Sequence, residues 1–199
     1  LNLCNKNMEK MDANNYDSGN AKHKLLAEVC LAAKYEGQSI KTHYPKYQAQ
    51  YPGSASTTCT ELARSFADIG DIVRGKDLFL GNTYESARRE DLEKNLKRIF
   101  AKIHSEVTTK GKNGAKELQE RYDGDGDNFF KLREDWWTAN RHTVWEALTC
   151  DVKSGNNYFR PTCSDGGNSK SQANNKCRCE GANADQVPTY FDYVPQYLR

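Results

Sequence analysis

The acidic stretch DGDGDNFFKLRE, residues 123–134, has a composition that could bind a calcium ion. Carboxylates stand at its first, third, fifth and twelfth positions, and they belong to Asp123, Asp125, Asp127 and Glu134. An EF-hand loop offers oxygens from these positions because calcium takes about six to eight hard oxygen ligands. The sixth position breaks the pattern, since the sharp turn there needs glycine and the sequence has Asn128. A calcium-binding helical module is therefore the alternative to a solvated acidic turn that precedes a helix.

Residues suited to catalysis are few. Asp68 and Asp71 are three residues apart and could share a helical face as paired carboxylates, but helices also display such pairs to water. The run GGNSKS, residues 166–171, lacks the spacing of a phosphate-binding loop. The histidines lack the spacing of metal ligands: His23, His43, His104 and His142. The sequence predicts no enzyme, no cofactor and no metal site.

Basic residues concentrate around one predicted helix and its exit, where they could bind a sulfated glycan. They are Arg88, Arg89, Lys94, Lys97, Arg98, Lys102, Lys110 and Lys112. Lys and Arg contact sulfate groups as they contact phosphates. The same helix carries Glu90, Asp91 and Glu93, so a salt-bridged face exposed to water is the other interpretation. Secondary candidates lie further along the chain: Lys153, Arg160, Lys170 and Lys176.

The composition is that of a globular domain without a strong bulk charge. The chain has 199 residues, of which 37% are hydrophobic and 11% aromatic, with 29 basic and 27 acidic side chains. A formal charge of +2 does not attract the whole chain to nucleic acid. The sequence lacks an apolar run of about 18 residues and a signal peptide, so we expect any membrane anchor to lie outside it.

The cysteines favour an oxidising compartment. There are seven, namely Cys4, Cys30, Cys59, Cys150, Cys163, Cys177 and Cys179. The odd number leaves one cysteine to stay free, to pair between chains, or to bond to a residue outside this sequence. Zinc is the competing explanation, but a single residue separates Cys177 from Cys179 and no histidine follows His142. Disulfides are the favoured interpretation.

Amphipathic helices must position these residues. Hydrophobic spacing predicts helices over 21–36, 59–75, 86–107, 114–122 and 128–150. Gly37 is expected to end the first helix, and the two prolines of residues 42–58 predict a loop after it. The tryptophans of the last helix fall among Leu and Val, so we interpret them as core anchors in preference to a sugar-stacking platform: Trp136, Trp137 and Trp145.

The composition changes after Cys150. Residues 151–187 are poor in apolar side chains and rich in Gly, Asn and Ser, so they need cross-links to hold a shape. Residues 188–199 are aromatic again and are interpreted as the start of a following helical subdomain. The sequence thus predicts an all-α fold, a disulfide-stapled helical bundle over about 1–150 with long irregular loops.

Three long stretches resemble one known family. They are CTELARSFADIGDIVRGKDLFLG (59–81), REDWWTANRHTVWEALTC (133–150) and CRCEGANADQVPTYFDYVPQYLR (177–199). They closely resemble the Duffy-binding-like domain, alpha type, of erythrocyte membrane protein 1, the variant surface adhesin of the malaria parasite. With LLAEVCLAAKYEG (25–37) added, the resemblance covers nearly the whole chain. It implies that residues 1–199 are the central part of one such domain, on the extracellular face of the infected erythrocyte.

The resemblance implies adhesion to host cells, with no enzymatic activity. The implied partners are receptors on erythrocytes or endothelial cells, blood-group glycans and heparan-sulfate-like glycans, with a role in rosetting and none in nucleic-acid binding. Membrane anchoring is expected only through parts of the parent protein outside this chain. The helices are expected to be scaffold and the loops variable. Under this interpretation Glu134 belongs to a helix surface and the acidic turn is an exposed loop.

The resemblance also implies a disulfide pattern. By similarity, Cys30 pairs with Cys150, Cys59 with Cys179, and Cys163 with Cys177. The partners of Cys177 and Cys179 could be exchanged. Cys4 resembles a cysteine that is bonded upstream in related domains, so we expect it to be unpaired in this chain.

Overall fold

The computed structural model describes residues 3–17, 19–51, 56–78, 81–109, 114–164 and 169–199. Its long helices are α2 (Ala21–Gln50), α3 (Thr58–Arg74), α4 (Thr83–Thr108) and α6 (Phe130–Leu148). The shorter helical elements are α1 (Lys6–Glu9), α5 (Ala115–Tyr122) and the 3₁₀ helices η1 (Ala13–Asn15), η2 (Gly181–Asn183), η3 (Phe191–Tyr193) and η4 (Gln196–Leu198). The strands are β1 (Pro161–Ser164) and β2 (Lys170–Gln172). The predicted helical fold is confirmed.

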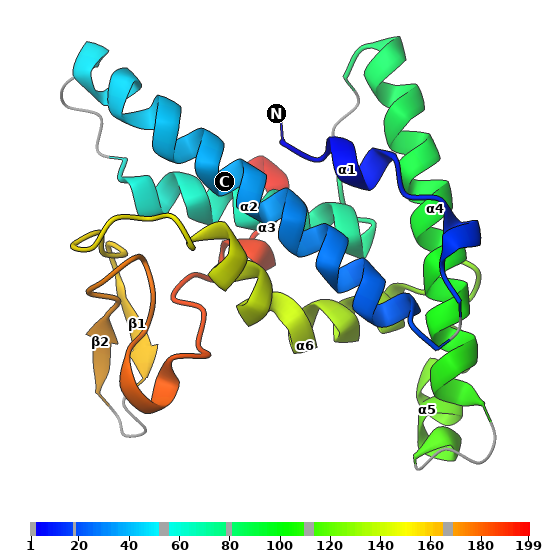
Figure 1. Ribbon diagram of the computed structural model, residues 1–199. Helices are drawn as coiled ribbons and strands as arrows, with labels where there is room; N and C mark the ends of the chain where they lie inside the picture. Colours follow the sequence, from blue (N-terminus) through cyan, green and yellow to red (C-terminus); the bar gives the residue numbers. More distant parts are fainter. Residues whose placement is uncertain (1–2, 18, 52–55, 79–80, 110–113, 165–168) are drawn as a thin grey trace.

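The helix α2 organises the bundle. It packs on α3 and α6, and it also contacts α4 near its own beginning (Figure 1). In the view of Figure 1, α4 stands at one side of the molecule with α5 beside its lower end, and the hairpin β1–β2 lies at the other side. The segment η3 packs on α3, so residues near the end of the chain lie against the middle of the bundle.

The ends of α3 and α4 follow from local sequence. The Thr57 hydroxyl accepts a hydrogen bond from the Thr60 N–H at 3.2 Å, which caps the start of α3. Gly75 ends α3 in the left-handed conformation with φ of 71°, which suits glycine because it has no Cβ. The Asn82 side chain caps α4 by accepting from the Glu85 N–H at 2.9 Å.

The predicted end of the first helix is wrong. α2 continues through Gly37 and Pro45 to Gln50, into residues that were expected to form a loop. A Cβ at position 37 would lie 2.0 Å from the Leu148 carbonyl oxygen, so this glycine allows the end of α6 to approach α2 closely. Beyond it, residues 41–50 are exposed except for Tyr44, which is buried. Packing therefore overrides the local stop signal at Gly37.

The tryptophans are core residues, as the helical spacing predicts. Trp136, Trp137 and Trp145 are buried, and Phe66 packs between the last two at ring-centroid distances of 5.1 and 5.2 Å. The indole N–H of Trp145 donates to the Cys177 carbonyl at 2.8 Å. The buried indole N–H of Trp145 therefore has a partner inside the molecule, as a buried indole requires.

The cysteine-rich segment forms an antiparallel hairpin, with Cys163 of β1 opposite Ser171 of β2. Disulfides join Cys59 to Cys177 and Cys163 to Cys179, so the predicted pairs Cys59–Cys179 and Cys163–Cys177 are exchanged. Lys176 and Cys177 have φ of 53° and 56°, and this local turn directs Cys177 toward α3 and leaves Cys179 to face the hairpin. The Cys59–Cys177 link spans 118 residues, and closing such a loop is worth ~4–5 kcal/mol in the chain-entropy model.

The predicted Cys30–Cys150 disulfide is absent. Cys4, Cys30 and Cys150 are free thiols, so the structure has three unpaired cysteines where one was expected. Cys150 lies just beyond the end of α6 and is exposed, whereas Val152 two residues later is buried. The chain therefore turns after α6 in a way that points Val152 into the core and Cys150 toward solvent.

Candidate functional site

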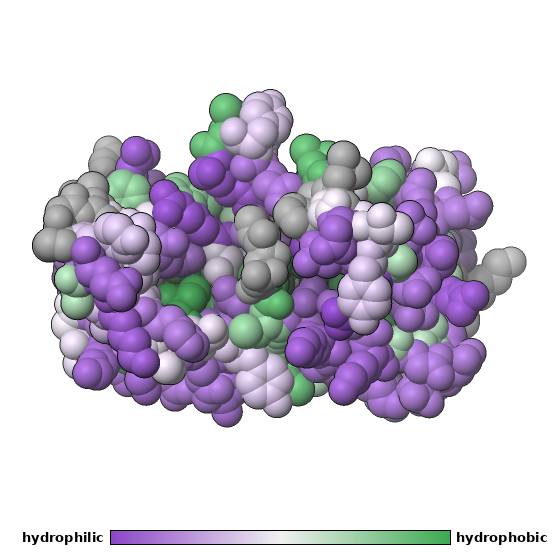
Figure 2. Space-filling view, turned by 90° about the horizontal axis from the view of Figure 1, so that it is seen from above, coloured by the Kyte–Doolittle hydropathy of each residue, from purple (hydrophilic) through white to green (hydrophobic). Residues whose placement is uncertain are grey.

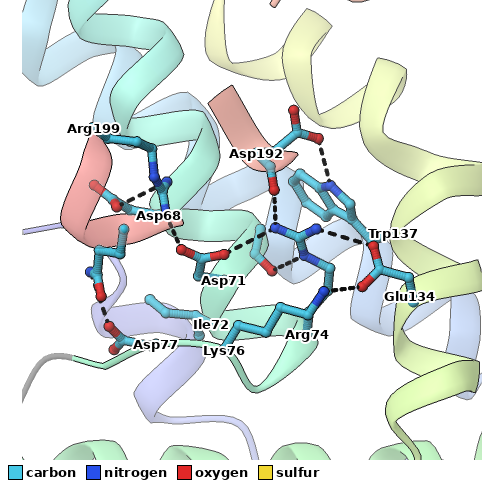
Figure 3. A network of polar contacts seen from close by, with 12 residues as sticks. Asp68, Asp71, Ile72, Arg74, Lys76, Asp77, Glu134, Trp137, Asp192 and Arg199 are labelled. Carbon is cyan, nitrogen blue, oxygen red and sulfur yellow. Dashed lines mark hydrogen bonds and ion pairs between the residues drawn. The ribbon is translucent and has the colours of Figure 1, made fainter. Parts of the chain in front are cut away.

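A polar network at the centre of the molecule joins α3, α6 and the end of the chain (Figure 3). Its side chains, called here the central network, are Asp68, Asp71, Arg74, Glu134, Trp137, Arg141, Asp192 and Arg199. Asp68, Asp71 and Arg74 come from α3, the next three from α6, and the last two from the closing residues. Each lies in one of the three stretches that carry the family resemblance.

Arg74 is the hub of the central network. Its side chain is 2% exposed and donates to the Gly70 carbonyl at 3.0 Å, to Asp71 at 3.0 Å and to Glu134 at 3.1 Å. It also donates to the backbone carbonyl of Asp192 (Figure 3). A buried guanidinium needs such partners because an unpaired buried charge is strongly unfavourable. Arg74 therefore fastens two helices and the closing segment together.

Asp192 connects the same segment to α6. Its carboxylate accepts from the Trp137 indole N–H at 2.9 Å and from the Arg141 guanidinium at 2.8 Å through each oxygen. Arg141 also donates to the Thr189 carbonyl at 2.9 Å. A bidentate contact of this kind fixes the orientation of the guanidinium relative to the carboxylate as well as the distance between them.

Asp68 and Asp71 are adjacent on α3 and are engaged by arginine. Arg199 pairs with both carboxylates, at 3.3 Å from Asp68, while Asp71 also pairs with Arg74. Burial raises the pKa of Asp68 to about 6, and the Arg199 charge opposes that shift. Burial likewise raises the pKa of Asp71, against the opposing charges of Arg199 and Arg74. Through these contacts Asp68 and Asp71 hold the closing residues against α3. The interpretation of the two carboxylates as a catalytic pair does not explain this role.

The acidic turn is explained by helix capping and ion pairing. Asp125 accepts from the Lys131 N–H at 2.8 Å and the Leu132 N–H at 3.0 Å, so it caps the start of α6. Glu134, the twelfth position of the EF-hand pattern, pairs with Arg74 and with Lys76 at 2.5 Å. In the described part of the chain, no three His, Cys, Asp or Glu side chains are grouped to hold a metal ion. Two of the four carboxylates considered for the alternative calcium loop, those of Asp125 and Glu134, therefore have structural partners within the chain.

The predicted basic set divides into structural and exposed members. Arg88 pairs with Glu9 and Arg89 with Asp77, and both arginines are partly buried. Lys102 donates to the Tyr16 carbonyl at 2.6 Å and to the Ala13 carbonyl. These three side chains hold the segment 9–16 and the residues after α3 against α4.

The remaining members define the α4 basic face, which consists of Lys94, Lys97 and Arg98. Lys94 and Arg98 are exposed and Lys97 is partly buried. Lys94 has a 3.5 Å contact with Asp91, and both side chains are largely exposed, so solvent screens this pair. Lys110 and Lys112 lie outside the described residues. Of the secondary candidates, Lys153, Arg160 and Lys170 are exposed and Lys176 is partly buried.

A cavity of about 400 Å³ between α2 and α3 was not predicted from the sequence. We call it the acidic pocket; it is lined among others by Glu36, Ile40, Tyr44, Tyr47, Glu61 and Asp68. Tyr44 and Tyr47 fall in residues that were interpreted as a loop. The spacing of Tyr44, Tyr47 and Tyr51 at three and four residues is a helical signal, but Pro45 within it argued against a helix.

Three features together define the class of protein: the central network, the disulfide-linked hairpin and the helical bundle. The family model described as Duffy binding domain matches residues 1–199, and the chain therefore belongs to this family. This confirms the resemblance seen in the sequence.

Solved structures make the relationship more particular. The chain is similar to the NTS-DBL1α domain of Plasmodium falciparum membrane protein 1 (PfEMP1) from the varO strain, with 40% identity and a TM-score of 0.71. That match covers 98% of this chain and 39% of the other. The varO double domain of NTS-DBL1α and CIDRγ is also 40% identical, with a TM-score of 0.65, over 88% of this chain and 23% of the other.

A more distant similarity involves a complex. The DBLβ domain of a PfEMP1 bound to human ICAM-1 is 27% identical, with a TM-score of 0.63, over 98% of this chain and 36% of that one. No curated protein sequence matches the chain. Within the described residues, none of the helices has both the length and the apolar character needed to cross a membrane.

Proposed function

We propose that this chain is part of a non-enzymatic adhesion module that binds receptors on the surface of host cells. The observation that carries the proposal is the similarity to PfEMP1 domains, one of which is bound to human ICAM-1. By that similarity, the parent protein is exposed on the infected erythrocyte and attaches it to other red cells or endothelial cells. A central network that fixes the helices would leave surface residues free to vary.

Within this module we place sulfated-glycan binding on the α4 basic face. Lys94 and Arg98 project into solvent, where their charges can meet sulfate groups without losing a structural partner. Arg88, Arg89 and Lys102 are engaged in contacts within the chain and are secondary in this proposal. One face of the molecule, seen from above in Figure 2, is mainly hydrophilic, with hydrophobic residues in small separate patches.

Heparin chromatography tests this placement. The double variant Lys94→Gln/Arg98→Gln should elute at lower salt than the unchanged chain, and the slope of log affinity against log salt should fall by about 1–2, because roughly one counterion is released per contact. The matched control is Lys34→Gln/Lys41→Gln, which removes two exposed charges from α2. An equal shift in both variants would show bulk charge to be responsible, and no shift in either would move the site elsewhere.

A second measurement tests receptor binding itself. Beads coated with the 199-residue chain are incubated with red cells and with ICAM-1-expressing endothelial cells, with and without soluble heparin. If the beads bind one cell type and heparin inhibits that binding, the glycan assignment is supported. Binding that heparin leaves unchanged would point to a protein receptor. Failure to bind either cell type would count against adhesion by this part of the parent protein.

A further inference from the structure

The acidic pocket combines aromatic rings with carboxylates. Its volume of about 400 Å³ lies within the range of small-ligand sites, roughly 300–1,000 Å³. Tyr44, Tyr47 and Tyr51 form a ladder along the last turns of α2, with ring-centroid distances of 6.1 and 4.9 Å between neighbours. Tyr47 is 49% exposed, so a ligand can reach this aromatic edge from solvent.

Tyr44 supplies an unused hydrogen-bonding group. Its side chain lines the pocket, the residue is 8% exposed, and its buried hydroxyl has no hydrogen-bond partner among the described residues. Leaving a buried hydroxyl unpaired is unfavourable, because it loses its hydrogen bonds to water without gaining others. A ligand with a hydrogen-bonding group at this position would remove that deficit.

One carboxylate of the pocket has no charged partner among the described residues. Of the three carboxylates that line the pocket, Glu61 pairs with Arg64 at 2.8 Å and Asp68 pairs with Arg199 at 3.3 Å, which leaves Glu36. The Glu36 carboxylate is buried, and its hydrogen-bond donors are the uncharged Cys4 N–H at 3.0 Å and Ser65 hydroxyl at 2.7 Å. A buried carboxylate with neutral donors attracts a cation, because the surrounding protein screens its charge less than water does.

We propose that the acidic pocket binds an arginine side chain of a partner polypeptide. A guanidinium stacks on tyrosine rings and presents five N–H donors in a planar fork, which suits carboxylates and the Tyr44 hydroxyl together. The chain already holds an arginine in this manner, since Arg74 lies 5.9 Å from the Trp137 ring centroid and pairs with Asp71 and Glu134. The negative charge of the pocket disfavours sulfated glycans, so this site and the α4 basic face select opposite ligands.

Nuclear magnetic resonance with short peptides tests the proposal. Acetyl-Gly-Arg-Gly-amide is titrated into the isotopically labelled 199-residue chain, alongside peptides in which Lys or the neutral isostere citrulline replaces Arg. The arginine peptide should shift the amide signals of Ser39, Ile40 and Ser65 in the pocket. The citrulline peptide should bind at least about fivefold more weakly because it lacks the charge.

Variants locate the binding and separate it from loss of structure. Glu61→Gln and Tyr47→Ser should each weaken arginine-peptide binding by about threefold or more. Their matched controls on α4, Glu90→Gln and Tyr84→Ser, should leave it unchanged, since both are exposed and lie outside the pocket. Retained spectra outside the pocket show that each variant is folded.

Several outcomes would overturn the inference. They are equal shifts with arginine and citrulline peptides, shifts located away from the pocket, or no shifts at tens of millimolar peptide. Pocket shifts with methyl galactoside, without an arginine response, would assign the site to neutral sugars. The inference does not depend on glycan binding: Lys94→Gln/Arg98→Gln should bind the peptide normally, and Glu61→Gln should elute normally from heparin.

Discussion

The central network and the α4 basic face use the same residue types in opposite ways. Arg74 is 2% exposed and makes contacts with two helices and the closing segment, whereas Lys94 is 66% exposed and has a single screened contact. A charge with fixed partners stabilises the fold and is unavailable to a ligand. A charge in solvent adds little stability and can bind. Basic residues in this chain must therefore be sorted by their partners before a role is assigned.

The contrast between the central network and the α4 basic face also explains the structural role of the three stretches that resemble the family. Stretches 59–81, 133–150 and 177–199 are far apart in sequence and meet in the central network and the Cys59–Cys177 disulfide. The α4 basic face belongs to none of them. The motifs thus describe how the scaffold is held together, and a binding surface built on α4 can vary without disturbing these contacts.

The strongest test of this contrast is Arg74→Met against Arg98→Met. Losing Arg74 removes a buried partner of Asp71, Glu134 and the Asp192 carbonyl, although Arg199 still pairs with Asp71, so we expect the free energy of unfolding to fall by ~3–5 kcal/mol. Arg98 is exposed, and its loss should change stability by less than about 0.5 kcal/mol. Urea unfolding followed by circular dichroism measures both. Equal, small losses would contradict the role of Arg74 as the hub.

A smaller effect is expected where α3 meets α6. A Cβ at Gly70 would lie 2.8 Å from the Trp137 ring, so Gly70→Ala should destabilise the chain by about 1–3 kcal/mol. Without that contact the change should stabilise a helix by about 0.5–1 kcal/mol. Thermal unfolding gives the sign directly, and Ser105→Ala on the exposed side of α4 is the control. A stabilised Gly70→Ala variant would show that Trp137 is free to move.

Short-range sequence patterns made much of this fold predictable. Hydrophobic spacing located the four long helices, and the tryptophans are buried as expected. The errors have one cause, which is contact between distant segments. Gly37 is a stop signal by itself but a close-approach site once Leu148 is beside it, and the turn at Cys177 decides which cysteine reaches Cys59.

The candidate sites were less predictable for the same reason. Sequence showed that basic residues cluster near α4, but not that Glu9 and Asp77 engage Arg88 and Arg89. The acidic pocket combines residues of α2 and α3, and its aromatic edge lies on turns of α2 that Pro45 appeared to exclude.

The central network should also give stability a pH dependence that an exposed carboxylate lacks. Burial raises the pKa of Asp68 to about 6, so between pH 4 and 6 the folded chain binds more protons than the unfolded chain. Asp68 therefore lowers the free energy of unfolding as pH rises through that window. The decrease is on the order of 1–2 kcal/mol once the screening of its charge by solvent is included. Asp71 and Glu36 strengthen the shift and Arg199 opposes it.

Asp68→Asn isolates this contribution. Subtracting the variant's unfolding free energy from that of the unchanged chain at each pH should give a difference that declines from pH 4 to 6 and is flat above pH 7. Asp127→Asn, at an exposed residue of the acidic turn, is the control for the loss of a carboxylate. A rising difference for Asp68 would mean that Arg199 outweighs burial.

The smallest expected effect lies in the acidic turn, where two aspartates of the same loop differ in their partners and in their exposure. Asp125 caps α6 through the N–H groups of Lys131 and Leu132, so Asp125→Ala should lower the free energy of unfolding by about 0.5–1 kcal/mol. Asp127 is exposed, and Asp127→Ala should have no measurable effect. Thermal unfolding with and without millimolar calcium completes the test. If Asp125 acts as a cap, the difference between the two variants persists with and without calcium. If calcium raises the melting temperature of the unchanged chain and both substitutions abolish that rise, the calcium loop is restored as the interpretation.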